Sequence, residues 1–189
     1  APCTPFDAAR RGLNLGEGAA MLVLELEETR RRRGREPRTR LLGYGGACDA
    51  HHLTAPHPEG AGLRAALAEA LACCRTSPAE LAFVNAHGTG TRDNDRVESA
   101  VLSRVLPGVP FLSTKGYTGH TLGAAGAIEA VFTAACLERG RIPASIGFET
   151  QDPECPAAPV REATPIRGAR ALSQSLAFGG NNAVIILGE

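Results

Sequence analysis

The amino-acid sequence predicts a layered α/β domain, and three observations support this prediction. Short apolar runs typical of buried strands alternate with segments whose apolar residues recur at helical spacing. Glycine-rich turns separate the two kinds of segment. The chain has 189 residues, 43% of them hydrophobic, so a core can form, and the length permits one domain or one and a part.

The composition argues against some classes of partner and indicates the cellular compartment. A formal net charge of zero argues against nucleic acid and membrane surfaces as partners, because both attract basic proteins. No apolar run is long enough to span a membrane, and the N-terminus lacks a basic-then-apolar signal pattern, so we expect a cytoplasmic protein. The six cysteines lack paired or zinc-like spacing, and we expect them to be reduced and mostly buried.

The first element is predicted over residues 19–25, a continuous apolar run typical of a strand buried on both faces. Glutamates and then arginines follow over residues 25–35, which favours one short helix whose end charges complement its dipole. A role for these arginines in meeting an acidic partner stays open. A polar break at residues 34–38 closes this first unit.

The remaining segments alternate as an α/β domain requires. Residues 61–74 have the apolar spacing of an amphipathic helix, and Ser77 and Glu80 have the spacing of a capping box. Residues 122–139 are rich in alanine and glycine, so we expect a tightly packed, buried helix. Residues 143–162 are predicted to be a loop. The other predicted elements are a helix from Asn94 or Asp95 to about Val105 and strands over residues 41–47, 81–85, 109–113, 171–176 and 182–187.

One lysine stands among twenty basic residues, and it lies between two histidine motifs. Lys115 follows Ser113 and Thr114, while His87 and His120 each sit in a turn rich in glycine and threonine. An ammonium is a compact charge that fits a small buried cage, whereas a planar guanidinium does not. Two histidines and one ammonium in such turns predict an active site.

The two histidines are predicted to be neutral hydrogen-bond donors. His87 ends a strand and His120 begins a helix, and α/β proteins present ligand-binding groups at such places. The helix dipole and a nearby Lys115 would both lower the pKa of His120 and keep its imidazole uncharged. Neutral imidazoles suit the stabilisation of a carbonyl oxygen that becomes an enolate.

Three carboxylates are candidate counter-ions for Lys115. Glu129 stands in an otherwise uncharged stretch, residues 123–136, so we expect it to be buried with a partner. Asp95 and Glu98 share one face of a predicted helix. Ordinary solvated charge is the competing interpretation for these two, and Glu98 alone does not overcome it.

Two further features lie near the histidines in sequence. Thr89 and Thr91 can bond the amides of an extended ligand or merely cap their turn, and the sequence favours neither. Phe178 precedes Gly179 and Gly180, whose backbone freedom suits a movable gate. A ring buried in the core is the alternative for Phe178.

Together these motifs resemble those of the β-ketoacyl-acyl-carrier-protein synthases, condensing enzymes of the thiolase superfamily. The resemblance covers essentially the whole chain but only the second half of such an enzyme. It implies the second half of a thiolase-like αβαβα sandwich, with residues 1–38 as the last strand and helix of the N-terminal half and residues 39–189 as the C-terminal half. The matching strings are Pro5-Phe6-Asp7 with Gly12, Gly16-Glu17-Gly18, Asp49-Ala50-His51-His52-Leu53-Thr54, Asn85-Ala86-His87-Gly88-Thr89-Gly90-Thr91, Ser113-Thr114-Lys115, Gly119-His120-Thr121-Leu122-Gly123-Ala124-Ala125-Gly126 and Phe178-Gly179-Gly180.

The resemblance implies a decarboxylative Claisen condensation of malonyl-carrier-protein with an acyl thioester, in fatty-acid, polyene or polyketide synthesis. A cysteine nucleophile in the first half would carry the acyl group, and none of the six cysteines here lies in that setting. His87 and His120 would assist decarboxylation and stabilise the enolate. Lys115 would hold Glu129 and order His120. The supporting carboxylates would be Asp49, Asp95 and Glu98.

The resemblance also implies the substrate side of the site. No cofactor would be bound covalently, and the phosphopantetheine arm of the acyl carrier protein would enter as substrate. The backbone amide of Phe178 would form an oxyanion hole with that of the cysteine. The substrate-binding residues would be Thr54, Thr89, Thr91, Phe178, Gly179 and Gly180. A cation site of some members maps onto Asn85, Glu129 and Ser173, and Gln174 here replaces a usual asparagine.

The implied partners are an acyl carrier protein, an N-terminal ketosynthase half with the cysteine, and a second ketosynthase or a chain-length factor in a homo- or heterodimer. The alternative function is a noncatalytic, chain-length-factor-like subunit, but such subunits usually lose the histidines that this chain keeps. A third possible function is that of a thiolase-like acyl-CoA enzyme, but the sequences of such enzymes are less similar to this chain in the His87 motif. Ala177 and Asn181 resemble variants found in synthases of polyene or other specialised chains.

Overall fold

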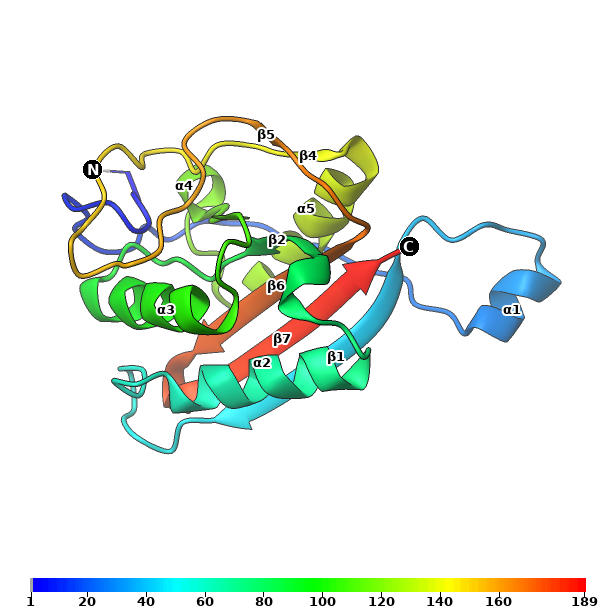
Figure 1. Cartoon of the computed structure of the whole chain (residues 1–189), viewed down its shortest axis with the longest axis horizontal. Coiled ribbons are helices and arrows are strands. Elements are labelled where there is room, and N and C mark those ends of the chain that lie inside the picture. Colours follow the sequence, from blue (N-terminus) through cyan, green and yellow to red (C-terminus); the bar gives the residue numbers. More distant parts are fainter. Residues whose placement is uncertain (1) are drawn as a thin grey trace.

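The computed structural model describes residues 2–189, which form a five-stranded mixed sheet with helices on both faces (Figure 1). Its strands are β1 (Arg40–Cys48), β2 (Leu81–Asn85), β3 (Phe111–Leu112), β6 (Arg170–Ala177) and β7 (Asn181–Gly188). They lie in the order β1-β7-β6-β2-β3. β2 runs parallel to β3 and β6, while β7 runs antiparallel to β1 and β6. A separate pair consists of β4 (Arg141–Ile142) and β5 (Thr164–Pro165).

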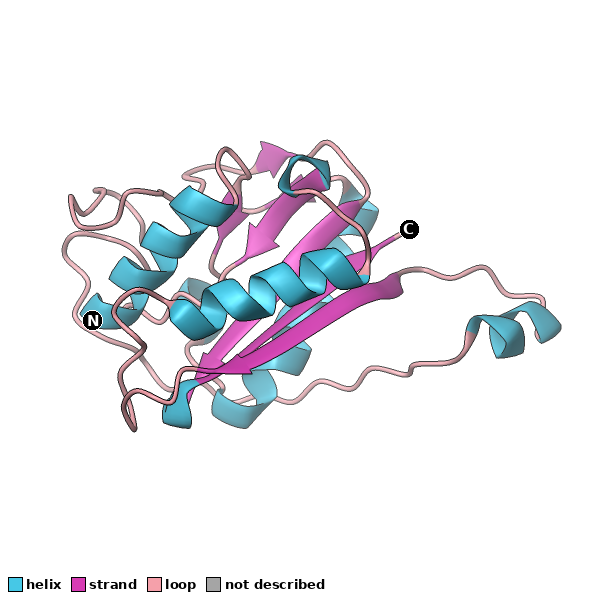
Figure 2. Cartoon of the chain, turned by 60° about the horizontal axis from the view of Figure 1, so that its bottom comes forward, coloured by secondary structure: helices cyan, strands magenta, loops and turns pink. Residues whose placement is uncertain are grey.

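Helices cover the two faces of the sheet with separate hydrophobic clusters. The helices within residues 2–189 are α1 (Glu27–Arg32), α2 (Ala61–Cys73), α3 (Arg92–Val105), α4 (Lys115–Thr118) and α5 (Ala125–Arg139). On one face, Leu67 of α2 and Leu102 of α3 join the cluster around Val84 of β2. On the other face, Cys136 of α5 packs against the cluster around Phe83. Successive strand residues point to opposite faces, so one strand serves both clusters. Figure 2 shows α2 lying across the sheet.

α2 approaches β1 so closely that only glycine fits beneath it. A Cβ atom at Gly45 would lie 2.1 Å from the carbonyl oxygen of Ala66, and one at Gly43 would lie 2.7 Å from that of Ala70. The glycine-rich character of the strand predicted over residues 41–47 is therefore a packing requirement of the helix above it.

The predicted α/β architecture is confirmed, with small shifts at element ends. α3 begins at Arg92, slightly before the predicted start, and β3 covers only the middle of residues 109–113. The predicted helix from residue 122 opens with a 3₁₀ turn, η2 (Leu122–Ala124), before α5. The capping box is present ahead of η1 (Pro78–Glu80), where the Ser77 amide donates to the Glu80 carboxylate at 2.8 Å.

The prediction of a buried strand at residues 19–25 is wrong for this structure. The segment pairs with no strand within residues 2–189, and the side chains of Met21 and Val23 are 90% and 92% exposed. An apolar run becomes a buried strand only where another strand accepts its backbone hydrogen bonds and other layers cover its faces. The short helix after it is confirmed as α1, which stands away from the sheet in Figure 1.

Two expectations about burial are also corrected. α5 is not buried throughout, since Val131 and Phe132 are partly exposed. All six cysteines are free, but Cys48 and Cys73 are exposed and only Cys3 and Cys155 are buried. No helix within residues 2–189 has the length and hydropathy needed to cross a membrane.

Candidate active site

Three parallel strands end at one edge of the sheet and bring together residues distant in sequence. His87 follows β2, Lys115 follows β3 and Phe178 follows β6. Because these strands are parallel, their carboxyl ends lie at the same edge, where loops can present side chains to one cavity. His120 joins them from the loop after α4, with its ring centroid 5.2 Å from that of His87.

The loop of His120 is held by a segment near the start of the chain. The His120 amide donates to the Asn14 carbonyl at 2.6 Å, and the Gly16 amide donates to the His120 carbonyl at 3.0 Å. Leu15 forms an isolated parallel bridge with His120 between these two bonds. The position of His120 therefore depends on contacts between residues more than one hundred positions apart.

Lys115 is buried against His87 and Glu129. Its ammonium donates to the His87 carbonyl oxygen, to His87 Nδ1 at 3.1 Å and to the Glu129 carboxylate. Lys115 and Glu129 are 1% and 2% exposed, so the two charges form a buried ion pair. Of the two histidines, Lys115 bonds directly to His87, whereas the resemblance placed its ordering effect on His120.

Hydrogen bonds fix which nitrogen of each imidazole is free. An ammonium can only donate, so His87 Nδ1 accepts from Lys115. His120 Nδ1 accepts from the backbone amide of Leu122 at 3.2 Å. A neutral ring with Nδ1 as acceptor carries its proton on Nε2. Both histidines therefore have an Nε2–H group available to a ligand.

Burial is the main reason that both rings are neutral. Desolvation lowers the pKa of His87 well below 6.5, and the charge of Lys115 acts in the same direction. The same two causes lower the pKa of His120 to about 4. The lowered pKa of His120 and the effect of Lys115 on it were predicted correctly, but the prediction named the helix dipole as a cause, whereas desolvation is the largest one.

These shifts predict a pH dependence. Between pH 4 and 6.5 the folded protein binds fewer protons at His120 than the unfolded chain, so this contribution to stability is complete above pH 6.5 and is lost as pH falls toward 4. We expect the imidazole signals of His120 in an NMR titration to stay constant down to pH 6.5 and to shift only near pH 4. A titration centred at 6.5 that disappears in His120→Asn would contradict this.

Glu98 supports the loop of His87, and its interpretation as a solvated helix charge is wrong. Its carboxylate is fully buried and accepts hydrogen bonds from the amides of His87 and Gly88 at 2.6 and 2.8 Å. The Gln174 side chain donates to it at 2.6 Å. Burial raises the pKa of Glu98, and these three donors oppose the rise. Glu98 makes no ion pair with Lys115 within residues 2–189.

Asp95 does not pair with Lys115 either, contrary to the sequence prediction. Its carboxylate accepts from the Thr89 amide at 3.0 Å and from the Gly90 amide at 3.1 Å. The cation beside it is Arg10, whose Nε lies 3.6 Å away. Burial raises the pKa of Asp95 to about 6. Asp95 thus holds the turn after His87, in which Gly90 adopts the left-handed φ of 75°.

Thr89 and Thr91 form a pair of hydroxyls on this turn. Their Oγ1 atoms lie 2.8 Å apart, and Thr89 Oγ1 also accepts from the Thr91 amide at 3.3 Å. Thr91 precedes α3 without making a side-chain cap bond to it. The Thr89 hydroxyl therefore stabilises the turn in which it lies, while the Thr91 hydroxyl can still form a hydrogen bond with a ligand.

A cavity of about 910 Å³ joins these elements. Phe178 is 70% exposed at this cavity, so its interpretation as a buried core ring is wrong. Lys115, Glu129 and the two helix carboxylates are buried and do not line it. No cysteine within residues 2–189 lines it. The predicted site residues that do line it are Asp49, Thr54, His87, Thr89, Thr91, His120, Phe178 and Gly180.

The turn that carries Phe178, η3 (Phe178–Gly180), is bonded to the loop after β1. The Gly179 amide donates to the Leu53 carbonyl at 2.7 Å, and the Asp49 amide donates to the Gly180 carbonyl at 2.8 Å. The Asp49 carboxylate accepts from the Gly62 amide at 2.9 Å and so ties this loop to α2. Gly179 and Gly180 have φ near 80°, in the left-handed region that glycine alone adopts readily.

Four buried side-chain oxygens have no hydrogen-bond partner within residues 2–189: Asn85 Oδ1, Thr114 Oγ1, Glu129 Oε2 and Gln174 Oε1. Asn85 and Glu129 belong to the candidate cation set, and Ser173 is the register partner of Asn85 across β2 and β6. Oxygen donors of this kind suit a hard cation or a water molecule. The described residues contain no cluster of three or more His, Cys, Asp or Glu side chains arranged for a metal ion.

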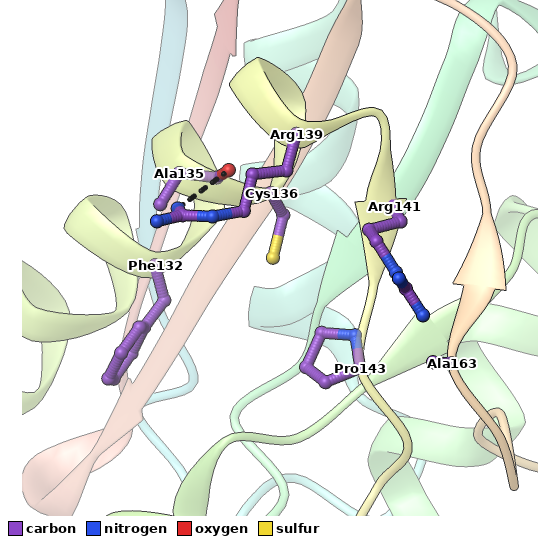
Figure 3. A pocket seen from close by; sticks show the side chains of 7 residues that line it. All are labelled: Phe132, Ala135, Cys136, Arg139, Arg141, Pro143 and Ala163. Atoms are coloured by element: carbon purple, nitrogen blue, oxygen red, sulfur yellow. Dashed lines mark hydrogen bonds between the residues drawn. The ribbon is translucent and has the colours of Figure 1, made fainter.

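A second cavity, of about 310 Å³, lies at the C-terminal end of α5 (Figure 3). Phe132, Cys136 and Pro143 give it an apolar lining, and Arg139 and Arg141 also line it. Burial raises the pKa of the Cys136 thiol, which makes it a poor nucleophile. Neither a histidine nor a carboxylate of residues 2–189 lines this cavity.

Sequence reasoning missed several residues of the site. Leu13, Leu15 and Leu122 line the large cavity, and their positions beside glycine turns and His120 were the available signal. Arg10 is buried under the threonine turn, but as one arginine among many it gave no signal in the sequence.

The comparison with known families decides the assignment. The family model described as "Beta-ketoacyl synthase, C-terminal domain" matches residues 39–149. This chain belongs to the β-ketoacyl synthase family. It is 39% identical over 97% of its length to 3-oxoacyl-[acyl-carrier-protein] synthase 2 of Staphylococcus aureus, of which it covers 47%. It is 42% identical over 97% of its length to a putative polyketide beta-ketoacyl synthase 1 of Streptomyces cyaneus, of which it covers 44%.

The solved structure named as the ishigamide ketosynthase/chain length factor superposes on this β-ketoacyl synthase chain with a TM-score of 0.93. The identity is 39%, and the superposition covers all of this chain and 47% of the other. The thiolase-like fold class is thereby confirmed. The chain spans about half the length of the relatives it matches, and its sequence is that of a C-terminal ketosynthase domain.

Proposed function

We propose that this chain supplies the decarboxylating and enolate-stabilising groups of a ketosynthase that condenses malonyl-carrier-protein with an acyl thioester. The observation that carries the proposal is the pair of neutral imidazoles of His87 and His120, which share one cavity and keep their Nε2–H groups free. Two preorganised donors beside each other suit a thioester carbonyl as it becomes an enolate.

In the proposed reaction, the thioester carbonyl oxygen of the malonyl group accepts hydrogen bonds from both imidazoles. The bond from malonyl C2 to the carboxylate carbon breaks, carbon dioxide leaves, and the electron pair forms the enolate. The enolate carbon then attacks an acyl carbonyl carried on a cysteine sulfur, and the carbon–sulfur bond breaks to release the thiolate. The amide of Phe178 would stabilise the tetrahedral oxyanion together with the amide of that cysteine.

The substrate proposed for this site is the phosphopantetheine arm of an acyl carrier protein, with no covalently bound cofactor. Thr89 and Thr91, whose hydroxyl oxygens lie 2.8 Å apart, line the cavity with His87, and Thr54 lines it from the loop after β1. Hydroxyls at these places can bond the amides of an extended arm. The relative from Staphylococcus aureus is itself named for an acyl-carrier-protein substrate.

We also propose that a segment equivalent to the other half of a ketosynthase supplies the cysteine and covers this chain. No cysteine of residues 2–189 lines the cavity, while apolar Met21, Val23 and Phe132 are exposed. In an αβαβα sandwich α5 would be a middle-layer helix with covering on both sides. The small cavity of Figure 3 lies on this uncovered part of α5. The complete enzyme would act as a dimer with a second ketosynthase or a chain-length factor.

Reconstitution tests the proposal. We expect this chain, produced together with an N-terminal ketosynthase segment that carries the cysteine, to release labelled carbon dioxide from malonyl-carrier-protein labelled in its free carboxylate. Binding of a dye specific for exposed apolar surface should fall on assembly. A folded assembly that binds the carrier protein but releases no carbon dioxide would overturn the proposal and favour the chain-length-factor alternative.

The gate role of Phe178 gives a further prediction. Phe178→Ala in the assembled enzyme should leave malonyl decarboxylation within about threefold of normal but blur discrimination between short and long acyl primers, because the exposed ring lines the cavity and precedes two glycines. Gly179→Val should slow acyl loading, since a β-branched residue does not adopt φ of 82° readily. Loading rates across primers of increasing length measure both effects, and an unchanged length profile in both variants would show that the ring gates nothing.

A further inference from the structure

Residues 3–12 wrap under the turn that carries Thr89 and Thr91. The Gly12 amide donates to the Gly90 carbonyl at 2.9 Å. The Cys3 thiol donates to the Thr89 carbonyl at 3.1 Å. A Cβ atom at Gly90 would lie 2.8 Å from the Gly12 carbonyl oxygen, so the two backbones are in direct contact. Residues 3–12 and the turn of Thr89 and Thr91 are far apart in sequence, and no pattern in either segment predicts that they are in contact.

Arg10 is the centre of this contact and is 3% exposed. Its Nε donates to the Thr91 carbonyl at 3.4 Å, and its Nη2 donates to the Arg92 carbonyl at 3.2 Å. Its Nη1 donates to the Asp7 carbonyl at 2.9 Å and to the Asp152 carboxylate. A guanidinium is planar and rigid, so bonds made at three nitrogens fix the carbonyls of the turn relative to its two anchors.

Asp95 completes the same turn with the opposite charge. It accepts from the amides of Thr89 and Gly90 and lies 3.6 Å from Arg10 Nε. The amides of the turn are thus bonded to a buried carboxylate and its last carbonyls to a buried guanidinium. Removing either partner leaves polar groups of the turn without a bond in a place closed to water, which is costly.

We propose that Arg10 is a positioning residue for substrate binding: it sets the orientation of the Thr89 and Thr91 hydroxyls toward the arm of the carrier protein. This inference rests on the proposed function of the cavity. Arg10 does not line the cavity and does not touch the reacting atoms. Its loss should therefore weaken binding of an arm that bonds the threonines and should spare a substrate that has no arm.

The test compares two malonyl thioesters in the assembled enzyme. Malonyl-carrier-protein has the full arm, whereas the malonyl thioester of ethanethiol has none of its amides. For Arg10→Gln we expect KM for malonyl-carrier-protein to rise about tenfold, the factor expected when a hydrogen bond to a charged group is lost. Decarboxylation of the ethanethiol ester should keep its kcat and KM.

Two variants accompany this measurement. Arg10→Lys keeps the charge beside Asp152 and Asp95 but cannot bond both carbonyls in one plane, so its KM should lie between those of the wild type and Arg10→Gln. It also serves as the test variant if Arg10→Gln does not fold. Arg11→Gln is the matched control, because Arg11 is exposed and its side chain makes no hydrogen bond or ion pair within residues 2–189. We expect it to behave as the wild type.

The outcomes separate this inference from the proposed function. An unchanged KM for malonyl-carrier-protein in a folded Arg10 variant overturns the positioning role. So does an equal loss of activity on both esters, which would show a general structural defect. If the wild-type assembly decarboxylates neither ester, the proposed function fails instead.

Discussion

His87→Ala and His120→Ala are each expected to abolish measurable decarboxylation of malonyl-carrier-protein in the assembled enzyme, while acyl transfer to the cysteine of the partner segment continues. Each substitution removes one Nε2–H donor from the cavity, and the loss of one such donor costs about 2.7–4 kcal/mol of transition-state stabilisation, or about 10²–10³ in rate. Release of labelled carbon dioxide measures the first step, and acylation by a labelled primer measures the second.

The control for the histidine variants is His51→Ala, because His51 is exposed and does not line the cavity. His120→Asn adds a graded case, since its amide can still donate a hydrogen bond but cannot reach as far as imidazole Nε2. Its rate should lie between those of the wild type and His120→Ala. Normal condensation in either alanine variant would refute the roles proposed for these residues.

Lys115→Ala is expected to cost about 3–5 kcal/mol of folding stability, because it leaves the carboxylate of Glu129 buried without a counter-charge. Burial already raises the pKa of Glu129, so without Lys115 the carboxyl should take up a proton as pH falls. A raised carboxyl pKa contributes stability at low pH that is lost as pH rises. The difference in melting temperature from the wild type should therefore shrink toward acid pH.

Two further variants isolate the ion pair. Glu129→Gln combined with Lys115→Ala should recover part of the lost stability, because no uncompensated charge then remains buried. Lys115→Arg should lose activity even where it folds, since a wider fork cannot make the bonds of one ammonium to His87 and Glu129. Full activity and an unchanged melting temperature in Lys115→Arg would show that the cage does not select for an ammonium.

Local sequence patterns predicted most of this fold. The spacing of Leu63, Ala66, Leu67 and Ala70 gave α2, and these residues are all buried in it. The short apolar runs gave the central strands, because strands buried on both faces need apolar residues at every position. The same rule failed at residues 19–25, since no sequence pattern says whether a second sheet is present to cover a strand.

The candidate site was likewise predicted where local sequence patterns determine it and missed where contacts between distant residues do. The glycine and threonine turns around His87 and His120 identified groups that face one cavity. The partners of Lys115 were identified only in part, since Asp95 and Glu98 have the spacing of counter-ions yet bond backbone amides instead. A carboxylate buried beside a turn satisfies whichever donors are closest, and spacing along a helix does not reveal them.

The contacts that residues 3–16 make with the loops of His87 and His120 also determine where the sequences of two such synthases can be joined in a chimera. The family match begins at residue 39, and a chimera joined there would combine the two histidine loops of one parent with the residues of another at Arg10, Gly12 and Asn14. Those residues hold the turn after His87 and the loop of His120 by their backbones and one guanidinium. A transferred segment that keeps both histidine loops together with these supports therefore begins at or before Cys3, and crossovers between relatives should be placed there.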